Sequence, residues 1–90
     1  MDIDNAIYLD PKEQTYQAEK AALQLRLNML KEALETAKAC IENFPDCSDA
    51  YLVAGIVEIR QGDKSSGLAK LRKAKEMGNA QADALIAKYN

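Results

Sequence analysis

The sequence predicts an all-α protein built of antiparallel helix hairpins that repeat along the chain. Three observations support this fold class. Apolar residues recur at helical spacing through most of the 90 residues. Gly, Pro and Asn stand where these segments end. Small residues and a helix breaker also recur at a constant interval. The chain is short enough to form one domain, and its 48% hydrophobic and 29% charged residues are typical of a folded protein.

The first helix is expected over residues 14–28, which contain no Gly or Pro. Thr15, or Asp10 followed by Pro11, offers a start signal. Asn28 can end the helix because asparagine tolerates left-handed backbone geometry. One face of this helix is apolar and consists of Ala18, Ala21, Ala22, Leu25 and Met29.

A second helix is expected over residues 30–43, where apolar residues again follow helical spacing and Pro45 lies just beyond the end. Its apolar stripe consists of Leu30, Ala33, Leu34, Ala37, Cys40 and Ile41. Residues 50–59 are rich in β-branched side chains and could form a buried strand. We interpret them as a helix because no other segment offers a partner strand.

The last two helices are expected over residues 64–77 and 80–89. Asp63 or Ser65 can cap the first of them, and Gly78 can end it. Asn79 is the expected cap of the second. The side chains predicted to face inward are Leu68, Leu71, Ala74 and Met77, followed by Ala84, Leu85 and Tyr89.

A constant interval relates the two halves of the chain. The step from Pro11 to Pro45 (45 − 11 = 34) equals the step from Ala33 to Gly67 (67 − 33 = 34). Small residues at matched places let the two helices of a hairpin approach closely, and a breaker fixes the length of each unit. Gly55 and Gly67 are expected to be the small residues at which the helices of the second hairpin approach each other.

This interval, with a helix–turn–helix in each copy, resembles the tetratricopeptide repeat. The residues at signature positions are Ala21, Ala33, Ala37, Cys40 and Pro45 in the first copy, and Tyr51, Gly55, Gly62, Leu71 and Ala74 in the second. The resemblance implies a short right-handed α-solenoid. It divides the chain into the tail of a truncated preceding repeat (1–11), two repeats (12–47 and 48–79) and a C-terminal capping helix (80–90). Another α-hairpin repeat or a plain helical bundle is the alternative.

In tetratricopeptide repeats the first helix of each repeat lines the concave face, so the resemblance implies an apolar groove. Its expected partner-binding residues are Ala18, Ala22, Leu25, Arg26, Leu52, Ile56, Ile59 and Arg60, with Thr15 and Asp49 on the same face. Such a groove would bind a peptide or helix of a partner protein, which makes the chain a non-catalytic interaction or assembly module. The partner could also be a set of preceding repeats.

Two other functions stay open. The chain could be the structural end of a longer repeat array, with no ligand of its own. The basic segment 64–77 could make weak nucleic-acid contacts, although no aromatic residue alternates with its lysines and arginine for base stacking. The net charge of −2 gives no general attraction to nucleic acid or to anionic lipid.

No enzymatic function and no cofactor or metal is expected. The chain has no histidine, so the commonest general base and metal ligand is missing. Cys40 is predicted to be buried on a helix face, and Cys47 is predicted to be an exposed thiol in a turn; a disulfide or redox switch between them is the alternative. No apolar run is long enough to span a bilayer and no secretion signal opens the sequence, which favours a cytoplasmic location.

Overall fold

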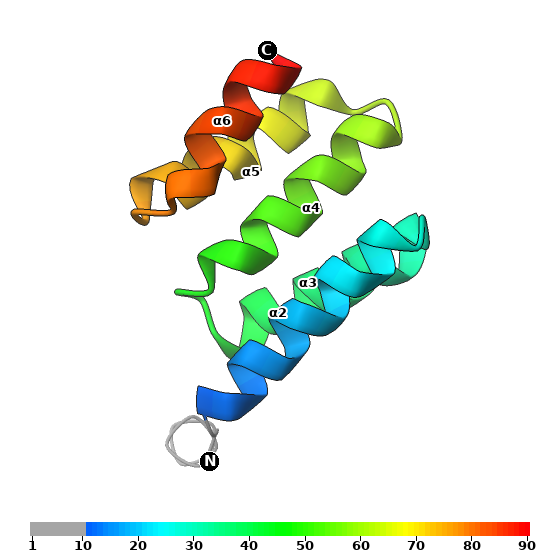
Figure 1. The fold of residues 1–90 in the computed structure, drawn as a ribbon, viewed down its shortest axis with the longest axis vertical. Coiled ribbons are helices and arrows are strands. Elements are labelled where there is room, and N and C mark those ends of the chain that lie inside the picture. Colours follow the sequence, from blue (N-terminus) through cyan, green and yellow to red (C-terminus); the bar gives the residue numbers. More distant parts are fainter. Residues whose placement is uncertain (1–10) are drawn as a thin grey trace.

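A computed structural model describes residues 11–90 and shows that this part of the chain is all-α (Figure 1). Its five helices are α2 (Pro11–Arg26), α3 (Leu30–Asn43), α4 (Ser48–Arg60), α5 (Lys64–Glu76) and α6 (Ala80–Tyr89). The β-branched segment 50–59 lies inside α4, which confirms the helical interpretation. The N-terminal part of the predicted preceding-repeat tail, residues 1–10, lies outside the described residues.

Three of the four connections between these helices contain a residue with left-handed backbone geometry. Asn28 has a φ of 63° after α2, Gly62 has a φ of 100° after α4, and Gly78 has a φ of 91° after α5. Asparagine and glycine adopt this geometry at low cost, so the chain can reverse within a few residues. Each helix runs antiparallel to the next one in the chain, including α3 and α4, whose connection has no such residue (Figure 1).

Two of the expected helix caps are formed by side chains. The Asp63 side chain accepts a hydrogen bond of 3.2 Å from the backbone N–H of Ser66 at the start of α5. The Asn79 side chain accepts one of 2.9 Å from the backbone N–H of Gln81 at the start of α6. Both bonds satisfy backbone donors that have no partner inside a helix, and both confirm the predicted caps.

The second hairpin is held together by direct contact between two backbones. A Cβ atom placed on Gly67 would lie 2.5 Å from the carbonyl oxygen of Gly55. A Cβ atom on Gly55 would lie 2.7 Å from the carbonyl oxygen of Gly67. No side chain fits between α4 and α5 at this point, so the predicted close approach of the two glycines is confirmed.

Beside this contact, a partly buried ion pair also joins α4 and α5. The Lys70 Nζ atom lies 2.8 Å from the Glu58 Oε1 atom. The Ser66 hydroxyl donates a further hydrogen bond of 3.0 Å to the same carboxylate oxygen. The hairpin is therefore closed by a glycine contact and by a hydrogen-bonded carboxylate.

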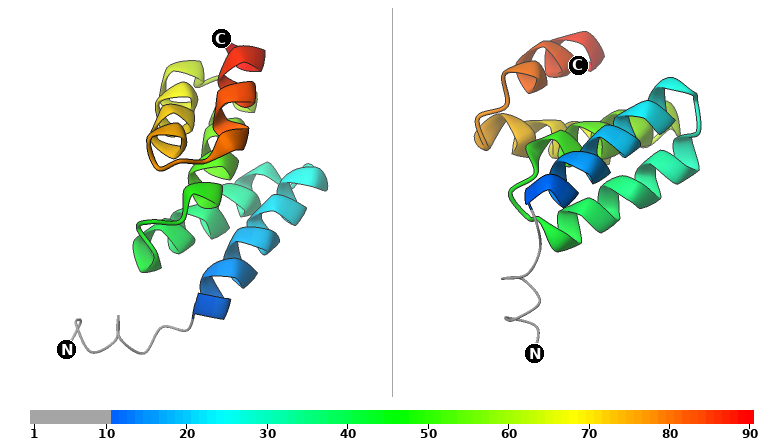
Figure 2. Two further views of the ribbon diagram at one scale, coloured as in Figure 1. Left: turned by 60° about the vertical axis from the view of Figure 1, so that its left-hand side comes forward. Right: turned by 60° about the horizontal axis from the view of Figure 1, so that its bottom comes forward.

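The helices pack in chain order, and α2 also contacts α4 (Figures 1 and 2). Two apolar clusters lie between them. The first joins α2, α3 and α4 through Ala18, Ala21, Leu25, Ala33, Ala37, Cys40, Cys47, Ala50, Val53, Ala54 and Val57. The second joins α4, α5 and α6 through Leu52, Leu68, Leu71, Ala74 and Ala82. Because α4 contributes to both, it is the central helix of the described chain.

Two expectations about burial are wrong. Cys47 was expected to be exposed, but its exposed fraction is 3%, because it packs into the first apolar cluster. Ala84 was expected to face inward, but it is exposed, and Ala82 takes the buried position. Leu85 and Tyr89 do pack against the second cluster, as expected.

Candidate interaction groove

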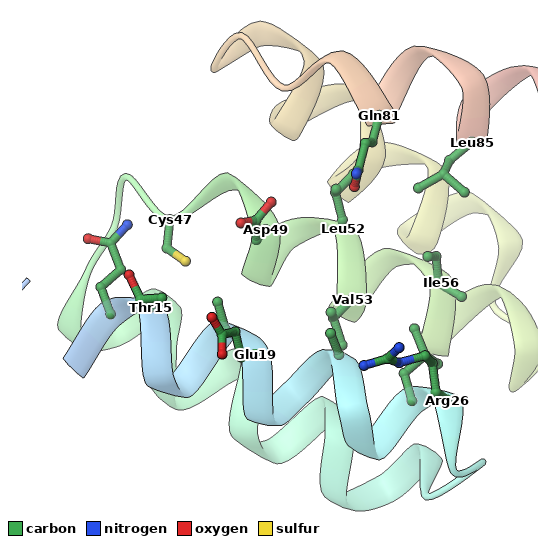
Figure 3. Close-up of a pocket in the computed structure, with 14 residues that line it drawn as sticks. Thr15, Glu19, Arg26, Cys47, Asp49, Leu52, Val53, Ile56, Gln81 and Leu85 are labelled. Carbon is green, nitrogen blue, oxygen red and sulfur yellow. The ribbon is translucent and has the colours of Figure 1, made fainter. Parts of the chain in front are cut away.

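A groove with a volume of about 440 Å³ lies between α2 and α6, with α4 as its floor (Figure 3). Seven apolar side chains line it, namely Ala18, Ala22, Leu25, Leu52, Val53, Ile56 and Leu85. The exposed residues on its rim are polar or charged, namely Thr15, Glu19, Arg26, Asp49 and Gln81. A concave apolar surface with a few polar groups at its edge is the usual form of a binding site.

The structure brings together six of the eight residues that the sequence predicts for the binding face. These are Ala18, Ala22, Leu25, Arg26, Leu52 and Ile56. Thr15 and Asp49, which the sequence places on the same face, also line the groove. The agreement arises because α2 and α4 present equivalent helical positions to the same side of the molecule.

The other two predicted residues lie outside the groove. Ile59 packs against the second apolar cluster, and its Cγ1 atom lies 2.5 Å from where a Cβ atom on Gly67 would be. Arg60 is exposed in the last turn of α4 and does not line the groove. Helical spacing predicts Ile59 on the same face as Ile56, but α5 packs against this end of α4, and Ile59 therefore contacts α5 at Gly67.

Several groove residues were not predicted. Glu19 lies four residues after Thr15 and seven before Arg26, so the helical period could have revealed it. Gln81 and Leu85 could not have been found in this way. Thr15 and Ala18 line the groove on α2, and two repeat intervals further along the chain are positions 83 and 86. The residues of α6 that line the groove are instead Gln81 and Leu85. The position of α6 therefore departs from the repeat.

Hydrogen bonds from one side chain fix the position of α6 relative to α4. The Asn79 Nδ2 group donates to the Ser48 hydroxyl at 3.0 Å and to the Asp49 Oδ1 atom at 2.9 Å. The same side chain caps α6 through its oxygen atom. Asn79 thus links the first turn of α6 to the first turn of α4, next to the rim of the groove.

Two free cysteines lie at the end of the groove near the first turns of α2 and α4. Cys47 lines the groove, and the Cys40 Sγ atom lies 3.9 Å from the backbone carbonyl oxygen of Gln14, which also lines it. Burial raises the pKa of Cys40 to about 12, with a further contribution from its hydrogen bond with Cys47. Cys40 is therefore protonated at neutral pH, the form of a cysteine that is a poor nucleophile.

The ionisable side chains that line the groove are Glu19, Arg26, Cys47 and Asp49. Within residues 11–90, no group of three or more His, Cys, Asp or Glu side chains is arranged to hold a metal ion. None of the helices in this range is both long and apolar enough to cross a membrane. The chemistry that the groove offers is burial of apolar side chains, with hydrogen bonds and charges at the edge.

No protein-family model, no curated protein and no solved structure matches the chain. Its function is therefore inferred from the geometry of the groove and from the sequence pattern.

Proposed function

We propose that this chain is a non-catalytic, tetratricopeptide-like module that binds a peptide or helical segment of a partner protein in the groove. The single observation that carries the proposal is the groove itself, an apolar surface formed by three alternate helices of the chain, α2, α4 and α6. Exposed polar residues at its edge can orient a bound segment while the apolar floor supplies the free energy of binding.

The proposed solenoid arrangement is supported by how the hairpins pack. Helix α2 contacts α4 as well as α3, and α3 contacts α4, so the two hairpins stack side by side. This is the packing that a tetratricopeptide-like array requires. The constant interval between matched small residues agrees with it, since Ala33 of α3 and Gly67 of α5 are both buried.

The basic residues of α5 give little support to nucleic-acid binding. Lys70 is paired with Glu58, and Lys75 lies 2.9 Å from the Asp83 carboxylate of α6. These carboxylates reduce the local positive charge that phosphate binding requires. The interaction groove therefore remains the better candidate.

The proposal is tested by selecting binding peptides from a random displayed library with the full 90-residue chain. Their affinities are then measured for two groove variants by fluorescence anisotropy. Ala22→Glu adds a charged side chain at a half-buried helical position, and Ile56→Asp places a carboxylate on the floor. Each variant should weaken binding by about tenfold or more, which corresponds to about 1.4 kcal/mol.

Ala39→Asp is the matched control because it adds a carboxylate to an exposed position of α3 outside the groove. It should leave peptide affinity unchanged. Circular dichroism establishes that each variant is folded, and Ala22→Glu keeps the test valid if Ile56→Asp does not fold. Selected peptides that bind the groove variants and the control equally well, or a library that yields no binder, would refute the proposal.

A further inference from the structure

A second apolar surface lies on α2, on the side away from α3. Tyr16, Leu23 and Leu27 have exposed fractions of 63%, 49% and 62%, and Met29 follows at the end of the turn. The spacings of seven and four residues place the first three on one face of the helix. A hollow with a volume of about 480 Å³ runs along this face and is lined by Tyr16, Glu19, Lys20, Ala22, Leu23 and Arg26. Large apolar side chains gathered on one exposed face indicate an interaction surface.

The equivalent face of α4 shows what kind of element covers such a surface. Ala50, Ala54 and Val57 stand one repeat interval after positions 16, 20 and 23, and all three are fully buried in the apolar cluster that α4 forms with α3. The covering element on α4 is thus an antiparallel helix. No helix among residues 11–90 covers the same face of α2.

We propose that a second copy of this chain covers the face, with the two α2 helices packed antiparallel about a twofold axis. The charges along the edge of the face fit this arrangement. Glu19 and Arg26 are seven residues apart and line the same hollow, so they lie on one edge of the apolar face. A twofold axis perpendicular to α2 reverses the direction of the helix, and it therefore places Glu19 of each copy beside Arg26 of the other.

This pairing also fixes the register of the apolar residues. The axis passes midway between positions 19 and 26, which is between Ala22 and Leu23. Leu23 of each copy then lies next to the axis, and Tyr16 lies near the C-terminal end of α2 of the second copy, where Leu27 is exposed. Apolar burial supplies most of the stabilisation, because exposed ion pairs contribute little. The two reciprocal ion pairs select this register over others.

The test measures association of the full chain by sedimentation equilibrium over a range of concentrations. The wild-type chain should form dimers. Leu23→Asp should abolish them without unfolding the chain, because Leu23 is half exposed. Glu19→Arg and Arg26→Glu should each weaken dimerisation by about tenfold, since like charges then face each other twice. Glu35→Arg, the same charge change on an exposed position of α3, should have no effect.

The decisive experiment mixes the two charge variants. In a mixed pair, one chain carries arginine at both positions and the other carries glutamate at both, so each contact joins opposite charges. The mixture should therefore dimerise as strongly as the wild type, while each variant alone does not. A wild-type chain that stays monomeric, as it would if residues 1–10 or a different protein covered the face, overturns the proposal. A mixture that associates no better than its components overturns it as well.

Discussion

Replacing Gly67 by alanine tests the close approach of α4 and α5. The new Cβ atom would lie 2.5 Å from the carbonyl oxygen of Gly55, 2.5 Å from the Ile59 Cγ1 atom and 3.0 Å from the Ile59 backbone N. Real Cβ contacts are essentially never shorter than 3.0 Å, so the carbonyl oxygen must move away until the contact reaches that distance. The Ile59 side chain can rotate away, but the backbone of α4 can move only if the two helices separate.

Two opposing effects determine how Gly67→Ala changes the free energy of unfolding. Alanine in the interior of a helix is more favourable than glycine by about 1 kcal/mol. Overpacking a tight contact costs about 1–3 kcal/mol, and the upper part of this range applies because the obstacle is a backbone atom. The net expectation is that the variant is less stable by about 1–2 kcal/mol. For a chain of this size, each kcal/mol lowers the Tm by about 4–8 °C.

The assay is urea unfolding followed by circular dichroism, with Ala69→Gly as the matched control. Ala69 is exposed in the same helix, so its replacement reports the Ala–Gly difference alone, a loss of about 1 kcal/mol. If the helices are not in contact, Gly67→Ala should gain about what Ala69→Gly loses. A stabilised Gly67→Ala variant would therefore refute the packing of this hairpin.

Two further predictions concern Asn79 and Cys40. Asn79→Ala removes the cap of α6 and two hydrogen bonds to α4. Urea unfolding should show that it destabilises the chain by about 1–2 kcal/mol. The control Asn43→Ala, at an exposed position, should have little effect on stability. Burial raises the pKa of Cys40 from its ordinary value of 9.0 to about 12, so its contribution to stability is complete below pH 9.0 and declines as the pH rises toward 12. Between pH 7 and about pH 10 the wild-type chain should therefore lose more stability than Cys40→Ala does. Equal losses in the two proteins would contradict the raised pKa.

The helices and their ends could be predicted from the sequence because their signals are local. Asn28, Asp63 and Asn79 act within one helical turn of their own position, and the structure places each where its chemistry indicates. The glycine contact was also predictable, since Gly55 and Gly67 sit in adjacent helices joined by a short turn. Most of the groove on α2 and α4 followed from helical spacing.

Features that depend on packing between distant segments could not be predicted. Cys47 stands in a turn with polar neighbours, and its burial arises because it packs in the apolar cluster formed by α2, α3 and α4. Gln81 and Leu85 enter the groove because Asn79 fixes α6 to α4, a contact between distant parts of the chain that no local pattern records. Ile59 has the spacing of a groove residue, but it packs against α5 at the contact between Gly55 and Gly67.

Helix α2 separates the two hollows, and Glu19, Ala22 and Arg26 border both of them. A side chain on this shared edge cannot make its full set of contacts with a peptide in the groove and with a second copy of the chain at the same time. Self-association and peptide capture would then be thermodynamically linked, so that ligand affinity falls as the concentration of the protein rises, and ligand in turn dissociates the pair by the same factor. Through the one helix α2, the concentration of the protein would then control its affinity for the peptide.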